Sequence, residues 1–160
     1  MPETLQTTPG QLRWPENTVR PTELILDDEF CGKVIEFVRD AKSEIRICAY
    51  RWFWYEQNPE IPIQKLNVEL MRAIARGVKI RAICDREEAA AALRSRGIDA
   101  RSLESQRLMH TKAFGIDSKT LVIGSHNLTK RAGQSNFEMS LATQEPQVIL
   151  AYIDYFDKLW

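Results

Sequence analysis

The chain has 160 residues, 44% of them hydrophobic and 28% charged, which is the length and composition of one globular domain. Its 22 Lys and Arg residues balance its 22 Asp and Glu residues, so any polyanionic partner has to be held by a local patch of charge. No apolar run approaches the roughly 20 residues that cross a bilayer, which excludes a transmembrane segment.

Residues 1–21 contain four of the seven prolines and lack both the cationic start and the apolar core of a secretory signal. Such a composition is typical of an extended or tethering segment. We therefore expect an extended or disordered N-terminal arm over residues 1–21 and one folded domain over residues 22–160.

Beyond the arm, helical and strand patterns alternate along the chain. The spacing of apolar residues predicts a helix from Asp27 and Asp28 to Ala41, a second that ends at Gly77, a third from Glu87 to Gly97, and a last that starts near Pro146. Apolar runs predict strands over residues 45–49, 78–84, 98–103, 108–116, 120–123 and 137–142. Together these elements predict an α/β fold, in which a mixed, mostly parallel β-sheet is flanked by helices on both faces.

The three cysteines, Cys31, Cys48 and Cys84, lie in apolar stretches and are far apart in the sequence. An odd count without a Cys-x-x-Cys pair favours buried thiols over disulfides or a metal site. We therefore expect a reducing compartment and a cytoplasmic location.

The densest polar cluster of the chain holds its only two histidines, at positions 110 and 126. If residues 109–114 form a strand, His110 and Lys112 project from the same face, a pairing that is unfavourable unless an anion such as phosphate lies between them. Ser125 and Asn127 are also two residues apart and offer a hydroxyl and an amide. These four groups predict a phosphoryl-transfer site without evident metal ligands.

The spacing of this cluster resembles the signature of the phospholipase D superfamily. His110, Lys112 and Asp117 form His-x-Lys-x4-Asp, and Gly-Ser-x-Asn follows six residues later at positions 124–127. Asn-Phe-Glu at positions 136–138 resembles the Asn-x-Glu element of that family, and the likeness extends from about Leu24 to the C-terminus. The resemblance implies an α/β phosphodiesterase whose catalytic residues would be His110, Lys112, Asp117, Ser125, Asn127 and Glu138.

The resemblance also implies a two-step exchange at a site built from two copies of the motif, whereas this chain has one. We therefore expect a homodimer in which one His110 attacks phosphorus to give a phosphohistidine, and His110 of the partner subunit protonates the leaving oxygen. Lys112, Ser125 and Asn127 would hold the non-bridging oxygens, and Glu138 would hydrogen-bond the other ring nitrogen of the nucleophile. No metal and no cofactor is implied.

Two residues of the cluster have a second interpretation. Asp117 could instead close a hairpin turn with Ser118 and Lys119, because on a continuous strand it would face away from His110. His126 fills the variable position of Gly-Ser-x-Asn, and we expect it to face away from the phosphate.

Two further groups are candidates for substrate binding. The aromatic run at residues 50–55 directly follows a predicted strand and fits a core and dimer interface, a platform on which Trp52 and Trp54 stack bases, or contact with lipid headgroups. Lys130 and Arg131 lie within a few residues of Asn127, where they could grip a flanking phosphate.

We expect a metal-independent nuclease that acts on DNA or RNA as a homodimer. The alternatives are phospholipid hydrolysis or head-group exchange at the same site, and a non-catalytic module that binds phosphate or DNA. The intact set of motif residues argues against the non-catalytic module.

Overall fold

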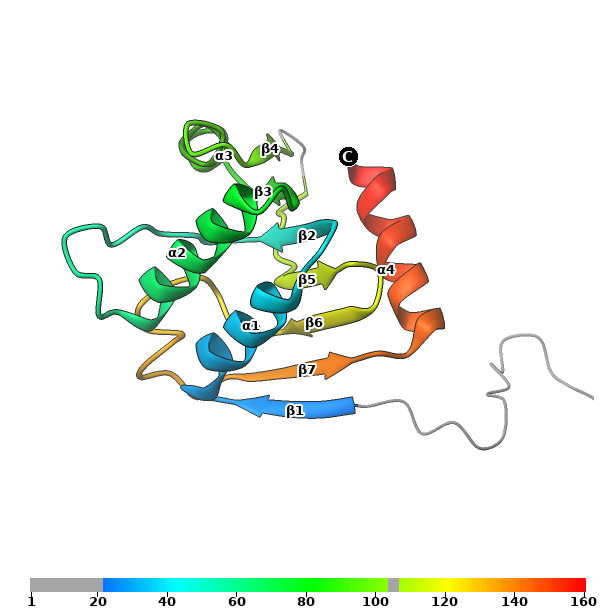
Figure 1. Cartoon of the computed structure of the whole chain (residues 1–160), viewed down its shortest axis with the longest axis horizontal. Helices are drawn as coiled ribbons and strands as arrows, with labels where there is room; N and C mark the ends of the chain where they lie inside the picture. The colour runs from blue at the N-terminus through cyan, green and yellow to red at the C-terminus, as the bar shows by residue number, and fades with distance from the viewer. Residues whose placement is uncertain (1–21, 104–106) are drawn as a thin grey trace, which may run out of the picture.

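The computed structural model describes residues 22–103 and 107–160, so the arm predicted over residues 1–21 lies outside the described residues. The described chain forms one sheet with helices on both sides (Figure 1). Its strands are β1 (Thr22–Leu26), β2 (Glu44–Ala49), β3 (Lys79–Cys84), β4 (Asp99–Ser102), β5 (Ala113–Ile116), β6 (Thr120–Gly124) and β7 (Met139–Thr143). Its helices are α1 (Glu29–Asp40), α2 (Pro62–Ala75), α3 (Glu87–Arg94) and α4 (Pro146–Leu159).

The strands of the sheet lie in the order β1-β7-β6-β5-β2-β3-β4. Only β2-β3 and β3-β4 pair in parallel, whereas β1-β7, β7-β6, β6-β5 and β5-β2 are antiparallel. The prediction of a mixed sheet is confirmed, but the prediction that it is mostly parallel is wrong. The physical reason is the type of connection: helices link β2, β3 and β4, whereas a tight turn links β5 to β6 and no helix separates β6 from β7 in this described stretch.

Two clusters of buried side chains lie on opposite faces of the sheet. Ile45 and Ile47 of β2 belong to the cluster that includes residues of α1, α2 and α3. Cys48 belongs to the other cluster, to which α4 contributes Tyr152 and Phe156. The prediction of helices on both faces is therefore confirmed. In the described part of the chain no helix has the length and apolarity needed to cross a bilayer.

The helices follow from the spacing of their apolar residues and from their first turns. In α1 the buried residues Phe30, Val34 and Val38 recur every four positions, on the face that packs against the sheet. Helices α2 and α4 begin with Pro62 and Pro146, whose fixed φ angle suits the first helical position. All four predicted helices are confirmed.

Strands β1 and β5 differ from the sequence predictions. The state of the cysteines agrees with them. The sequence patterns do not predict β1, because only Ile25 of its five residues is buried and no alternation results. Strand β5 begins at Ala113, so residues 107–112 approach the sheet as an irregular segment. The three cysteines are buried and free, as predicted.

The strand pairing brings several segment ends to one edge of the sheet, which we call the motif edge. Ala113 pairs with both Cys48 and Ile123, and Gly124 pairs with Ser140. The residues that follow β2 and β6 therefore lie beside those that precede β5 and β7. These are the segments that carry most of the residues predicted to form the site.

Candidate active site at the motif edge

His110 and Lys112 lie at the motif edge, just before β5. The Nζ atom of Lys112 is 3.0 Å from Nε2 and 3.1 Å from Nδ1 of His110, and it donates to the carbonyl oxygen of His110 at 2.7 Å. The ring of Tyr50, directly after β2, lies 4.8 Å from the imidazole. Burial lowers the pKa of Lys112, an effect that the nearby charge of Glu138 partly offsets. The imidazole and the ammonium therefore meet at one exposed spot that is open to an anion.

Ser125 and Glu138 form a second hydrogen-bonded group at the same edge. Ser125 Oγ donates to Glu138 Oε2 and accepts from the backbone N–H of Met139 at 3.1 Å. Asn136 Nδ2 donates to Glu138 Oε1 at 3.0 Å, and the backbone N–H of Glu138 donates to Asp27 Oδ1 at 2.9 Å. Ser125 and Asn136 thus each donate to one oxygen of the Glu138 carboxylate, whereas the expected hydrogen bond from His110 to Glu138 is not found between these two described residues.

Gly124 lets β6 approach β7 closely at the motif edge. A Cβ atom on Gly124 would lie 2.3 Å from the carbonyl oxygen of Met139 and 2.2 Å from Ser140 Oγ, so a larger residue does not fit. Three residues later, Asn127 has a buried Oδ1 atom without a hydrogen-bond partner among the described residues. Buried polar atoms are almost always paired in folded proteins. The Asn127 amide therefore has hydrogen-bonding capacity left for a ligand.

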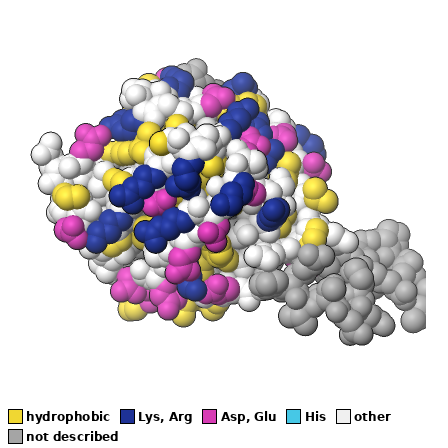
Figure 2. All heavy atoms as spheres, in the orientation of Figure 1, with side chains coloured by type: hydrophobic (Ala, Val, Ile, Leu, Met, Phe, Trp, Pro, Cys, Tyr) yellow, Lys and Arg dark blue, Asp and Glu magenta, His cyan; other side chains and the backbone are white. Residues whose placement is uncertain are grey.

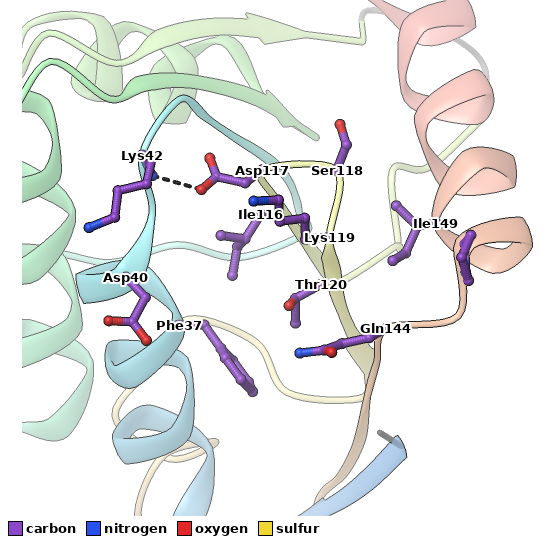
Figure 3. A pocket seen from close by; sticks show the side chains of 11 residues that line it. Phe37, Asp40, Lys42, Ile116, Asp117, Ser118, Lys119, Thr120, Gln144 and Ile149 are labelled. Atoms are coloured by element: carbon purple, nitrogen blue, oxygen red, sulfur yellow. Dashed lines mark hydrogen bonds between the residues drawn. The ribbon is translucent and has the colours of Figure 1, made fainter. Parts of the chain in front are cut away.

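Asp117 lies at the opposite end of β5, in the β5–β6 turn, apart from the other motif residues. Its carboxylate accepts from the backbone N–H groups of Lys42, Ser43 and Glu44 at 2.7, 2.8 and 3.0 Å (Figure 3 draws the bond to Lys42). Burial alone would raise the pKa of Asp117, but these hydrogen bonds outweigh it and the pKa is lowered. Asp117 and Ser118 have φ angles of 51° and 53°, as a tight hairpin turn requires. The catalytic assignment of Asp117 is therefore corrected: the residue closes the hairpin and fastens it to β2.

A hollow of about 610 Å³ opens beside this turn, between the end of α1 and the start of α4 (Figure 3). Its apolar lining includes Phe37, Ile116 and Ile149, and its polar lining includes Lys42 and Lys119. The hollow lies at the edge opposite to His110, so it is not part of the candidate active site.

His126 is a buried core residue, and its ring does not face the other motif residues, as expected from its variable position in Gly-Ser-x-Asn. Its ring stacks on Phe30 with 4.3 Å between ring centres, and Nδ1 lies 2.7 Å from Ser140 Oγ. Nε2 lies 2.9 Å from the carbonyl oxygen of Asp27. Burial lowers the pKa of His126, partly offset by the hydrogen bond to Asp27 and the charge of Glu138. The ring thus faces away from the cluster around His110.

Trp52 is also a core residue, which corrects its assignment as a stacking platform. Its side chain is 5% exposed, and Nε1 donates to Asn67 Oδ1 at 2.8 Å. The half-buried Trp54 has the guanidinium of Arg96 4.4 Å from its ring centre and lies nearly parallel to Trp52, with 6.4 Å between the ring centres. A buried ring has no free face for a base, so these two contacts favour the core interpretation of the aromatic run.

Lys130 and Arg131 are exposed on the loop that follows Asn127. The backbone N–H of Lys130 donates to the hydroxyl of Tyr55 at 2.8 Å, which holds this loop against the aromatic run. The two cations therefore stand beside the motif edge.

Sequence reasoning gave no individual role in the site to three contacting residues. Tyr50 touches His110, while Asp27 and Asn136 hold Glu138 in place. The position of Tyr50 directly after a predicted strand, and that of Asn136 within Asn-x-Glu, could have indicated their place in the site. Nothing in the sequence indicates the contact of Asp27 with Glu138, because the two residues are 111 positions apart. Within residues 22–103 and 107–160, no three His, Cys, Asp or Glu side chains are grouped to hold a metal ion.

Comparisons with known proteins agree with this arrangement. A family model described as "Cardiolipin synthase, PLD-like domain" matches residues 34–160. Mitochondrial cardiolipin hydrolase of Danio rerio is 30% identical over 140 residues, which cover 81% of this chain and 56% of that protein. The Xenopus tropicalis protein of the same name is 36% identical over 92 residues, which cover 54% of this chain and 44% of that protein. The chain thus spans about half the length of the curated relatives it matches.

Two solved structures share the fold. Nuc from Salmonella typhimurium, a phospholipase D family member, has a TM-score of 0.74 at 22% identity, over 89% of this chain and 95% of that chain. NucT from Helicobacter pylori has a TM-score of 0.71 at 17% identity, over 88% of this chain and 96% of that chain. Because the family model covers most of the chain, the chain belongs to the phospholipase D-like family. The resemblance stated from the sequence is confirmed.

Proposed function

We propose that this member of the phospholipase D-like family is a homodimeric, metal-independent phosphodiesterase that hydrolyses nucleic acid through a phosphohistidine. The observation that carries the proposal is the contact of the exposed His110 imidazole with Lys112 at an edge that also holds Ser125, Asn127 and Glu138. A phosphodiester supplies the anion that this pair of basic groups lacks.

In the proposed mechanism a neutral His110 attacks the phosphorus atom. A nitrogen–phosphorus bond forms, the bond to the leaving oxygen breaks, and the protonated His110 of the partner subunit gives that oxygen its proton. Water then attacks the phosphohistidine, transfers its proton to the second histidine and releases the first. Lys112 and the side chains of Ser125 and Asn127 stabilise the charge that builds on the non-bridging oxygens.

Exposed apolar side chains support a second copy of the chain as the partner. They gather on the α4 side of β1, β6 and β7, at positions not covered by α4: Leu24, Leu26, Ile123, Met139 and Leu141. This apolar sheet face ends at the motif edge, where Phe137 is 99% exposed next to Glu138. A contiguous apolar face marks an interaction surface, and a two-fold dimer buries the same face of both copies.

The choice of nucleic acid rests on the cations beside the site. Lys130 and Arg131 are exposed on the loop after Asn127, where they can bind phosphates on either side of the scissile bond. Phospholipid hydrolysis is the second candidate, because the curated relatives are named cardiolipin hydrolases and because Phe53, Leu108 and Phe137 are exposed.

The cytoplasmic location stays a prediction, since the location in the names of the relatives belongs to those proteins.

Oligonucleotide cleavage with and without excess EDTA tests the proposal. Cleavage should survive chelation, fall about 10³-fold or more in His110→Ala, and stay unchanged in Lys158→Ala, whose side chain is exposed on α4. Undiminished cleavage by His110→Ala would refute the assigned nucleophile. Binding without turnover would favour a non-catalytic module, and hydrolysis of cardiolipin vesicles without oligonucleotide cleavage would favour the lipid substrate.

A further inference from the structure

Three arginines gather around one buried carboxylate: Arg39 on α1, Arg72 on α2, and Arg76 directly after α2. The side chain of Glu69 is 5% exposed; its Oε2 is 3.5 Å from Arg39 Nε and 3.3 Å from an amino nitrogen of Arg72, and its Oε1 is 3.2 Å from one of Arg76. The three arginine side chains remain 60%, 64% and 40% exposed, in the same order. The buried Glu69 carboxylate therefore holds the three guanidinium groups in place, while part of each arginine side chain stays exposed to solvent.

The charge of this arginine cluster is not balanced. One glutamate faces three arginines, which leaves two positive charges in excess, and Lys65 nearby is paired with Glu60 at 2.9 Å. Figure 2 shows Lys and Arg side chains gathered on the face that α1 and α2 form in Figure 1. A local surplus of this kind attracts a polyanion even though the chain as a whole has no net charge.

A hollow of about 340 Å³ lies next to the cluster. Arg39, Arg72 and Lys65 supply its cationic lining, Glu60 and Glu69 its acidic lining, and Ile35 and Val68 are among its apolar lining residues. Arginine binds phosphate through a fixed fork of donors, and apolar surface next to such a fork suits the sugar and base that accompany the phosphate.

We propose that the arginine cluster is an exosite that binds the backbone of a nucleic acid away from the catalytic histidine. The identity of the polyanion rests on the proposed nuclease function. A bilayer surface is a less suitable partner. Docking on lipid needs exposed apolar side chains that can insert, and among the described residues of α1 and α2 only Val68 is large, apolar and exposed.

The exosite extends the candidate active site along a helix. Helix α2 has 14 residues and is about 21 Å long, and it starts on the side of the motif edge, where the chain arrives from β2. Lys65 lies in its first turns, whereas Arg72 and Arg76 lie at its end. A strand several nucleotides long can follow α2 from the active site to the cluster.

Binding of a labelled single-stranded oligonucleotide at several salt concentrations tests the exosite. The variant Arg39→Gln/Arg72→Gln leaves the buried Glu69 paired with Arg76, and its melting temperature is measured as a check on folding. We expect about tenfold weaker binding and a slope of log Kd against log salt that is lower by about 1.4, which corresponds to two lost phosphate contacts. Arg39→Lys/Arg72→Lys, which keeps the charge but not the fork, should lie in between. Lys119→Gln/Lys158→Gln, a matched loss of two exposed cations outside α1 and α2, should leave binding unchanged.

Hydrolysis of bis-p-nitrophenyl phosphate, which is too small to reach the cluster, should be unchanged in the exosite variant. An unchanged salt slope would overturn the exosite, and so would weaker binding to anionic phosphatidylglycerol vesicles with normal oligonucleotide binding. Dissociation of the dimer by the substitutions would assign the surface to a second copy instead. Failure of the proposed nuclease function is distinguished from failure of the exosite by the cleavage assay, because in that case the His110→Ala variant would still cleave the oligonucleotide.

Discussion

His110 is exposed beside Lys112, whereas His126 is 1% exposed and stacks on Phe30. Sixteen positions apart on the same motif edge, the two imidazoles thus have opposite surroundings. An open imidazole next to an ammonium can bind and attack a phosphoryl group, while a buried one that contacts Ser140 and a backbone carbonyl holds the loop in place. The surroundings, and not the residue type, support the proposed catalytic role of His110 and the structural role of His126.

The buried state of His126 predicts a pH-dependent stability. Burial lowers the pKa of His126 in the folded chain, so the unfolded chain binds its proton more readily, at pH values below about 6.5. The free energy of unfolding should therefore fall as the pH drops from about 6.5 towards the folded-state pKa, and the contribution should be fully present at higher pH. Urea unfolding at pH 7.5 and 5.5 measures this, and His126→Gln should reduce the difference. An equal difference in the variant and the wild type would contradict the assignment.

At the scale of elements, the β5–β6 hairpin depends on Asp117. Asp117→Asn removes the charge that three backbone N–H groups and the Ser43 hydroxyl bind, so we expect the free energy of unfolding to drop by about 1.5–3 kcal/mol. Hydrolysis of bis-p-nitrophenyl phosphate per folded molecule should stay within about twofold of the wild type. Stability measured in urea and kcat measured on the same samples separate the two effects. A large loss of kcat at unchanged stability would restore Asp117 to the catalytic set.

Periodicity predicted the helices well and the strand directions poorly. Helix α1 buries Phe30, Val34 and Val38 at a spacing that only a helix gives, so it can be read from the sequence. Strand β5 is four residues long and buried throughout, and such a run looks the same in a parallel and in an antiparallel sheet. The turn predicted at Asp117 makes β5 antiparallel to β6, but no local pattern indicates that β5 also pairs antiparallel with β2.

The candidate site was predictable where the motif residues lie next to strand ends, as His110 and Lys112 do before β5 and Ser125 does after β6. His110, Lys112 and Ser125 meet because β5 and β6 pair, and a hairpin already predicts this. The burial of Trp52 depends on Asn67 of α2, and the orientation of Glu138 depends on Asp27. These tertiary contacts join segments that no local pattern connects. The sequence therefore predicts a core position for the aromatic run only as one of three interpretations, and it does not predict the contact of Asp27.

At the scale of the whole molecule, the motif edge carries one of the two histidines that the proposed chemistry needs. In the proposed dimer the second histidine comes from another copy, and the apolar face that includes Leu24, Met139 and Leu141 is where that copy can pack. The arginine cluster lies on the opposite face of the sheet with α1 and α2, so the proposed dimer leaves it open to a long substrate.

The most direct test of the shared site is the activity of mixed dimers. Wild-type and His110→Ala chains are mixed in known ratios, dissociated in denaturant, refolded together and assayed with bis-p-nitrophenyl phosphate; Lys158→Ala chains mixed in the same way serve as the control. If each site needs a histidine from both copies, the rate follows the square of the wild-type fraction, and an equal mixture retains about a quarter of the wild-type rate. A rate proportional to the wild-type fraction, with about half retained in the equal mixture, would show that one chain works alone.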